Sequence, residues 1–158
     1  GKVLLGGTPL NKAFDTGFSS RGWKKSGRIP FVSTSNIDEL KKVINLDIKS
    51  QKAHFKSLGM KFGKDFHNIS IEFDFEKDRV GLEVQFGKYF SVQYDIYTKF
   101  VPLYNENKID LGIEIVPMKS MSKNMVAGPA NFERNAHEII RQGRTNPPCP
   151  LILIGIEP

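Results

Sequence analysis

The stretch IEFDFEKDRVGLEVQFGKY, Ile71 to Tyr89, decides the fold of the region around it. Apolar and polar residues alternate along it in two short runs, which is typical of two β-strands that each bury one face. Between the runs, Glu76 to Arg79 predicts the turn of a hairpin. If the two ends of that turn pair, Asp74 becomes the diagonal neighbour of Glu83 on the polar face, roughly 7–8 Å away at the backbone.

Two carboxylates that converge beside an extended backbone can bind a hard divalent cation such as Mg²⁺. Asp74 and Glu83 supply the carboxylates, and the main-chain carbonyl of Val84 is the natural third ligand. Gln85 lies on the same strand face as Glu83. A cation held there would lower the pKa of an attacking water and neutralise charge on the transition state of phosphodiester hydrolysis. Acidic residues on the solvent face of a hairpin are also common, so the spacing alone leaves a hairpin without metal open.

The remaining segments predict one domain, since 158 residues can bury a single core. We expect residues 1–30 to be irregular apart from a helix near Pro9 to Phe18. The further elements predicted are a helix over residues 36–55, strands over 69–75 and 80–86, a helix over 91–103, a strand over 109–116, a loop over 119–131, a helix over 132–141 and a strand over 151–156.

This order predicts the sheet topology. A β-α-β-α-β order needs right-handed crossovers and gives parallel strands, whereas the strands of a hairpin are antiparallel. The fold class is therefore α/β, mixed with α+β: a central mixed sheet flanked by helices. The predicted helices carry apolar stripes at Ile37, Leu40, Ile44 and Ile48, at Val92, Ile96, Phe100 and Leu103, and at Phe132, Ala136, Ile139 and Ile140. Ser35 or Asn36 would cap the first of them and Ser91 the second.

The positive charge of the chain is concentrated in one segment. The net charge is +6, and Arg21 to Lys64 holds eleven Lys or Arg residues against three Asp or Glu. Such a segment fits a polyanion-binding surface, and it equally fits a solvated, lysine-rich helix.

Cysteine content and hydropathy bear on the location of the protein. Cys149 is the one cysteine, so no disulfide framework can form within the chain, which suits a reducing, cytoplasmic compartment. No apolar run approaches the length of a membrane-spanning helix, so we expect no membrane association.

Four segments resemble the type II restriction endonucleases of the BglII family: KDRVGLEVQFGKY, KIDLGIEIVPMKSMS, IIRQGR and PLILIGI. They occur in the same order and with similar spacing over most of residues 74–158, and RGWKK at Arg21 to Lys25 is similar more loosely. The family has the PD-(D/E)xK nuclease fold, with whose core the predicted order of elements is compatible. The resemblance thus implies a single nuclease domain over residues 1–158, with its catalytic core over 69–158.

The resemblance also implies an activity. It implies a Mg²⁺-dependent homodimer that cleaves double-stranded DNA at a short palindromic site, commonly with a GATC centre, and leaves 5′-phosphates. A cognate DNA methyltransferase is implied in the host. Ile37 to Phe55 is a candidate for the dimer interface.

On the family motif, Asp74 matches the first acid and Glu83 the second. Gln85 takes the position that is lysine in the general motif, and Phe73 stands where the motif has proline. Because glutamine carries no charge near neutral pH, we expect Gln85 to orient water and the metal to activate it.

Two loops and one helix end are the predicted DNA contacts. The family approaches bases directly after the catalytic strand, and the other two segments are rich in polar and basic side chains, which suit phosphate and base contacts. The predicted residues are Lys88, Tyr89, Lys119, Ser122, Asn124, Arg141 and Arg144.

Two other functions remain open on the residues. One is a DNA-binding protein on the same fold that has lost catalysis, which the presence of Asp74, Glu83 and Gln85 disfavours. The other is a repair nuclease that recognises DNA structure rather than sequence, which the resemblance of the C-terminal half disfavours.

Overall fold

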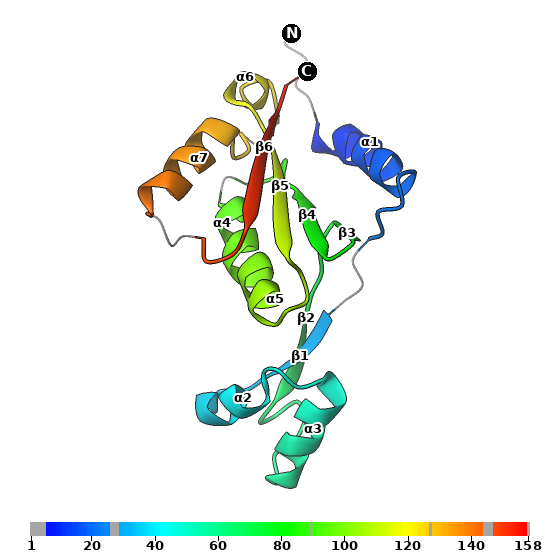
Figure 1. Ribbon diagram of the computed structural model, residues 1–158, viewed down its shortest axis with the longest axis vertical. Helices are drawn as coiled ribbons and strands as arrows, with labels where there is room; N and C mark the ends of the chain where they lie inside the picture. The colour runs from blue at the N-terminus through cyan, green and yellow to red at the C-terminus, as the bar shows by residue number, and fades with distance from the viewer. Residues whose placement is uncertain (1–5, 26–28, 89, 127, 144–146, 158) are drawn as a thin grey trace. The chain divides into compact units, whose positions relative to one another are not determined.

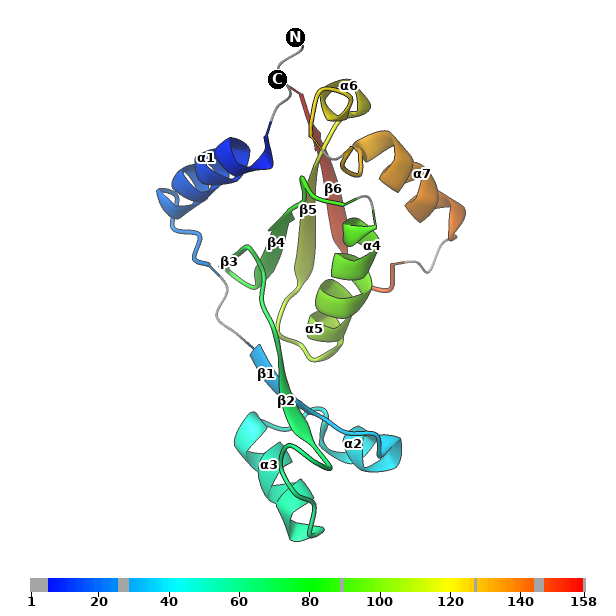
Figure 2. The same cartoon turned by 180° about the vertical axis from the view of Figure 1, so that it is seen from behind.

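The structure, a computed structural model, describes residues 6–25, 29–88, 90–126, 128–143 and 147–157 (Figures 1 and 2). Its contacts divide the chain into two compact units, Gly1–Ser26 with Phe73–Pro158, and Gly27–Glu72. Each unit has its own sheet and its own buried apolar cluster. The single nuclease domain over residues 1–158 stays a prediction.

The larger unit contains a four-stranded mixed sheet in the order β3-β4-β5-β6. Its strands are β3 (Phe75–Lys77), β4 (Val80–Val84), β5 (Leu111–Pro117) and β6 (Leu151–Ile156). β3 pairs antiparallel with β4, and β4, β5 and β6 are parallel. The mixed α/β and α+β character predicted from the order of the elements is confirmed. None of the described helices is both long and apolar enough to cross a membrane.

The register of the hairpin at β3 and β4 differs from the prediction by two residues, since Glu76 pairs with Gly81 rather than with Arg79. Lys77 pairs with Val80, so the turn contains only Asp78 and Arg79, and the predicted turn over residues 76–79 is wrong. Both turn residues have positive φ, 49° and 64°, as the two-residue hairpin turn that matches strand twist requires. The Arg79 guanidinium bonds to both carboxylate oxygens of Asp110, at 2.7 Å each, which fixes the turn.

The strand predicted over residues 69–75 is also wrong, because it divides between the two units. β2 (His67–Ile71) pairs with β1 (Ile29–Ser33) in the smaller unit, and β3 begins only at Phe75. Asp74 therefore lies in the connection that immediately precedes β3.

Helices cover both faces of the four-stranded sheet (Figures 1 and 2). One face packs on α1 (Gly7–Ser19), which contains the helix expected near Pro9 to Phe18. The other face packs on a continuous helical run and on α7. That run comprises α4 (Ser91–Asp95), a π-helical segment η1 (Ile96–Phe100) and α5 (Val101–Asn105); the remaining helices of this unit are α6 (Lys119–Ser122) and α7 (Phe132–Arg141).

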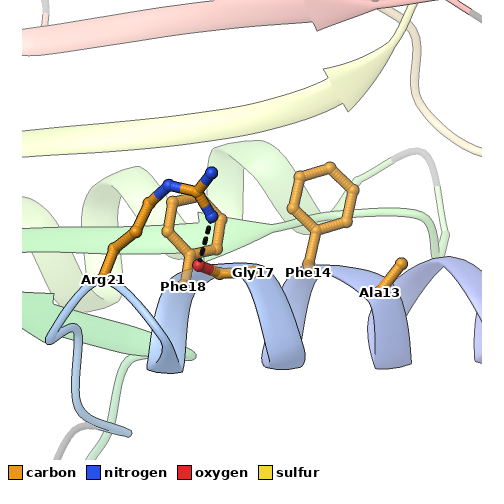
Figure 3. Close-up of a pocket in the computed structure, with 5 residues that line it drawn as sticks. All are labelled: Ala13, Phe14, Gly17, Phe18 and Arg21. Carbon is orange, nitrogen blue, oxygen red and sulfur yellow. Dashed lines mark hydrogen bonds between the residues drawn. The ribbon is translucent and has the colours of Figure 1, made fainter.

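The α1 face of the sheet is apolar. Leu82 and Val84 of β4 point into it and meet Phe14 and Phe18 of α1. Figure 3 shows both rings projecting from α1 toward the strands, beside Arg21, whose Nη1 donates to the Gly17 carbonyl at 2.8 Å. The pocket drawn there, of about 370 Å³, is lined by Ala13, Phe14, Gly17, Phe18 and Arg21, and it contains no carboxylate.

The opposite face is built around two glycines. Gly81 and Gly112 are register partners on β4 and β5, and the rings of Phe73 and Phe100 stack on each other at 5.3 Å over them. A Cβ at Gly112 would lie 2.8 Å from the Phe100 ring, so only glycine lets η1 approach this closely. The apolar line predicted for this helix is confirmed, since Val92, Ile96, Phe100 and Leu103 are buried.

The smaller unit packs two helices on its two-stranded ribbon. α2 (Ile37–Val43) and α3 (Ile48–Ser57) replace the single helix predicted over residues 36–55. The helix is interrupted between them because Asp47 caps α3. The Asp47 carboxylate accepts hydrogen bonds from the N–H groups of Lys49 and Ser50. Asn36 caps α2, as one of the two predicted caps.

Three predicted helix details are wrong. Ile37 and Ile44 are 56% and 43% exposed, because the small core uses Val32, Val43, Phe55 and Phe66 instead. Ile140 is 79% exposed near the end of α7. Ser91 is the first residue of α4, and its neighbour at the cap position makes no side-chain cap bond.

Candidate active site

Asp74 lies one position beyond the end of the β3–β4 ladder. Its Oδ2 accepts from the backbone N–H of Val84 at 2.9 Å, in the place where a further strand residue would otherwise pair. The carboxylate is therefore fixed beside the carboxyl end of β4. This contact connects the first predicted acid to the strand that carries the second.

The Val84 carbonyl points in a direction that suits the predicted third ligand. A residue in a strand directs its N–H and C=O to the same side. The Val84 N–H is turned toward Asp74, whereas the next N–H, that of Gln85, bonds to Ile115 on β5 at 2.8 Å. The Val84 carbonyl thus shares the Asp74 side of β4.

Glu83 points to the opposite sheet face from Leu82 and Val84, because side chains alternate along a strand. It is 3% exposed and lies against the helical run. Its Oε1 accepts from Lys99 Nζ at 2.7 Å, and the same ammonium bonds to Asp95 Oδ1 at 2.9 Å. Asp95 and Lys99 are four residues apart, one helical turn, so one helix face supplies both groups.

Gln85 shares the face of Glu83, as the alternation predicted. Its Nε2 donates to Asp95 Oδ2 at 3.1 Å, and its Oε1 accepts from the Gly87 N–H at 2.9 Å. A Cβ at residue 87 would lie 2.7 Å from that oxygen, so the glycine allows the contact. The amide is consequently held at both ends.

Glu114 is the most deeply buried carboxyl group of the site. It is the register partner of Glu83 on β5, is 0% exposed, and neither of its oxygens has a hydrogen-bond partner within the described residues. An orphaned buried carboxyl is costly unless it is neutral or meets a cation.

Burial and mutual repulsion shift the ionisation of this cluster. Burial, and then the nearby Asp95 carboxylate, raises the pKa of Glu83 to about 8 against the opposing charge of Lys99. Burial also raises the pKa of Glu114 well above its usual value, followed by the charges of Asp95 and Glu83. For Lys99, burial of the ammonium is outweighed by the two carboxylates that it contacts, and its pKa is raised.

The cluster therefore has more carboxyl groups than cations, and this is the feature that fits a divalent metal. Among the described residues, the Lys99 ammonium faces four carboxyl groups, those of Asp74, Glu83, Asp95 and Glu114. No set of three or more His, Cys, Asp or Glu side chains is arranged to hold a metal within the described ranges. A ligand set of two carboxylates and a main-chain carbonyl, as predicted, contains only two such side chains.

Sequence reasoning missed Asp95, Lys99 and the depth of Glu114. The signal for the first two was an acid and a base four residues apart in YDIYTKF, flanking the apolar line of the predicted helix. For Glu114 the signal was its place inside an apolar strand that has parallel neighbours on both sides, since such strands are buried on both faces.

The predicted DNA contacts fall at two ends of the sheet. Lys88 follows β4 and is exposed, and Lys119 and Asn124 follow β5, so all three lie near the carboxyl ends of the parallel strands. Ser122 is buried there, its hydroxyl directed at the Lys119 carbonyl. Arg141 is exposed and is the last residue of α7. Tyr89 and Arg144 lie outside the described residues.

Comparison with known proteins gives one result over nearly the whole chain. The family model described as restriction endonuclease BglII/BglIII matches residues 4–156. No curated protein matches the sequence. The family match spans α1, the smaller unit and every strand of the four-stranded sheet.

Proposed function

The chain belongs to the BglII/BglIII restriction endonuclease family, and from that premise we propose that it is a Mg²⁺-dependent, type II site-specific deoxyribonuclease. Its substrate would be double-stranded DNA with a short palindromic site. The family membership supports the class of reaction, and the residues around β4 support its chemistry.

One observation carries the proposal: the hydrogen bond between Asp74 and the Val84 N–H. It brings the first acid to the carboxyl end of the strand that holds Glu83, on the side of β4 to which strand geometry directs the Val84 carbonyl. These are hard oxygen donors, which Mg²⁺ prefers. The surplus of carboxyl groups over cations further favours a divalent ion there, because a bound cation offsets repulsion and burial together.

In the proposed mechanism, Asp74, Glu83 and the Val84 carbonyl hold the metal, which supplies charge neutralisation and a lower pKa for the attacking water. Gln85 orients that water. A glutamine amide has two N–H donors, and the hydrogen bond to Asp95 uses one of them, so the second can be directed at a water oxygen. Gly87 keeps the amide in this orientation through its N–H.

The remaining parts of the proposal follow from family membership. Cleavage of both strands of a palindrome needs two active sites related by twofold symmetry, which a homodimer provides. We further propose a GATC-centred site, 5′-phosphate products, a cognate methyltransferase in the host and action in the cytoplasm. The DNA contacts proposed are those of Lys88, Tyr89, Lys119, Ser122, Asn124, Arg141 and Arg144.

The test is digestion of unmethylated phage DNA with Mg²⁺, followed by the same digestion in EDTA. Discrete fragments with Mg²⁺ and intact DNA with EDTA are expected. DNA binding without cleavage in any divalent metal would instead indicate a binding protein that has lost catalysis. Cleavage confined to branched or flapped DNA would indicate a repair nuclease.

Glu83→Gln tests the site assignment. We expect the variant to bind DNA and to cleave at least about 100-fold more slowly. The amide lacks the negative charge of a carboxylate ligand, and the proposed catalytic role of that charge requires the bound metal and the phosphate. Glu106→Gln, a change in an ion pair outside the cluster, is the matched control and should cleave normally. Full activity in Glu83→Gln would refute the assignment.

A further inference from the structure

We propose that Lys99, carried by the helical run rather than by the catalytic strand, supplies the positively charged group that Gln85 cannot supply at the active site. The inference rests on the proposed function, since it takes phosphodiester hydrolysis at Glu83 as the reaction. It assigns Lys99 direct contact with the scissile phosphate, and Asp95 the task of orienting it.

The position of the Lys99 ammonium supports this role. Its Nζ lies 2.7 Å from Glu83 Oε1 and 2.9 Å from Asp95 Oδ1. It is the hydrogen-bond partner of the Glu83 carboxylate within the described residues. Lys99 therefore touches the same side chain that is proposed to hold the metal, on the same sheet face as Gln85.

The number of donors on the ammonium leaves room for a substrate. An ammonium has three N–H groups, and the contacts with Glu83 and Asp95 use two of them. The Lys99 side chain is 20% exposed, whereas Glu83 and Asp95 are 4% and 3% exposed. The third N–H can thus reach a ligand from the solvent side, and a non-bridging phosphate oxygen is the acceptor that suits it.

Gln85, which occupies the motif's lysine position, brings no positive charge to the site. Its amide is neutral, and both of its ends make contacts, with Asp95 and Gly87. Asp95 binds Gln85 through Oδ2 and Lys99 through Oδ1. The strand residue is therefore linked, through one carboxylate, to a cation on the neighbouring helix.

The helix geometry fixes the position of Lys99. The residue lies within η1, a π-helical turn that the Val101 N–H closes on the Ile96 carbonyl. Pro102 follows and has no N–H with which to continue the α-helical pattern. Such turns are rare in proteins, and those that occur are often found at functional sites. Ile96 and Phe100, which lie before and after Lys99 in this segment, are both buried and anchor it on the sheet.

The proposed role is electrostatic. As water attacks, negative charge grows on the non-bridging oxygens of the pentacovalent phosphorus, and a fixed ammonium stabilises that charge more than it stabilises the ground state. Lys99 gives up no proton in this step. Its effect should appear in the rate of cleavage and much less in DNA affinity.

Lys99→Met removes the charge and keeps the length of the side chain. On a fragment carrying a site mapped with the wild-type protein, we expect cleavage to slow at least about 100-fold and DNA affinity in EDTA to change less than about threefold. Lys108→Met, which removes an ion-paired lysine outside the cluster, should leave both unchanged. Cleavage by Lys99→Met within about threefold of wild type would overturn the proposal.

A rescue experiment separates a catalytic charge from a structural one. Gln85→Lys in the Lys99→Met background restores a lysine at the strand position, and we expect the rate to rise at least about 10-fold above that of Lys99→Met alone. A purely structural Lys99 predicts no recovery, since its hydrogen bonds to Glu83 and Asp95 remain absent. That result, with the double variant folded, would also overturn the proposal.

Loss of Lys99 leaves buried carboxylates unpaired, so Lys99→Met could fail to fold. In that case the variant Asp95→Asn is compared with the double variant Asp95→Asn/Lys99→Met. The Asp95→Asn change removes from both proteins one of the carboxylates that the loss of Lys99 would leave unpaired. Cleavage only by the variant that keeps Lys99 supports the proposal, and equal rates overturn it. If the wild-type protein cleaves no DNA with any divalent metal, the proposed function fails; if wild type cleaves and the Lys99 variants match it, only this inference fails.

Discussion

At the residue scale, the central feature is a buried group of acids with one cation. Asp95 and Glu114 surround the pair formed by Glu83 and Lys99, and Glu114 has no partner of its own within the described residues. Structural ion pairs are usually balanced, because an unpaired buried charge is strongly destabilising. An unbalanced cluster at the end of a central strand is more typical of a site that binds a cation and acts on an anion.

This cluster predicts how stability depends on pH. The folded-state pKa of Glu83 is raised from 4.5 to about 8, so the folded protein binds more protons than the unfolded chain between these values. The free energy of unfolding must therefore fall as pH rises through that window. In EDTA, we expect Glu83 to account for a loss on the order of 2 kcal/mol between about pH 6 and pH 9.

The measurement is urea unfolding of wild type and Glu83→Gln at both pH values. The variant cannot ionise at this position, so its loss of stability over the same range should be smaller by that amount. Glu106→Gln should follow the wild type. Equal losses in wild type and Glu83→Gln would show that the Glu83 carboxyl ionises normally in the folded state.

At the element scale, the distance between the helical run and the sheet decides whether the site forms. Gly112 lets the Phe100 ring lie directly on β5, and Phe100 adjoins Lys99 on η1. The contact of Lys99 with Glu83 therefore depends on packing made one residue away. The close approach of η1 to the sheet therefore requires glycine on the strand.

Gly112→Ala tests this dependence. The added Cβ would lie 2.8 Å from Cγ and Cδ1 of the Phe100 ring, so the helix must move away from the sheet. We expect unfolding to become easier by about 1–3 kcal/mol and cleavage to fall by more than the smaller folded fraction explains. Gly17→Ala, whose Cβ would meet nothing closer than 3.8 Å, is the control and should keep wild-type cleavage. Normal activity in folded Gly112→Ala would show that the site tolerates a shifted helix.

At the scale of the whole molecule, the proposed catalytic acids and a stripe of lysines lie in different units. The acids of the site belong to the larger unit, whereas much of the basic segment from Arg21 to Lys64 belongs to the smaller one. On α3, Lys49, Lys52 and Lys56 are spaced along one helix face, and none makes an ion pair within the described ranges. Unpaired lysines in a stripe suit phosphate contacts.

We therefore expect the α3 lysines to strengthen DNA binding without affecting sequence preference. Replacing Lys49, Lys52 and Lys56 by Ala should weaken binding, and the slope of log affinity against log salt should fall by roughly 0.9 for each phosphate that is no longer neutralised. Lys41→Ala/Lys42→Ala is the control, because these lysines pair with Asp38 and Glu39. An unchanged slope in the triple variant would indicate that α3 is only a solvated helix face.

The sequence predicted more of the fold than of the site. The family resemblance is confirmed by the match over residues 4–156, and the parallel β4, β5 and β6 by the strand pairing. The hairpin register was wrong by two residues because Asp78 and Arg79 adopt positive φ without a glycine to indicate it. The alternation at residues 69–75 described burial correctly near Phe73 and Phe75 but could not show that the segment divides between two units.

By itself, the sequence determined the strands of the four-stranded sheet and their order along the chain, because alternation and apolar spacing record which side of each strand is buried. It also determined Asp74, Glu83 and Gln85 as candidates, since they lie close together along the chain. Only the tertiary structure brought in Asp95, Lys99 and Glu114. The contact of Lys99 with Glu83 joins residues 16 positions apart, and Glu114 meets Glu83 only through strand pairing. The spacing of residues along the chain does not reveal which residues meet across a sheet or between a sheet and a helix. The balance of charge at this site is therefore decided by tertiary packing.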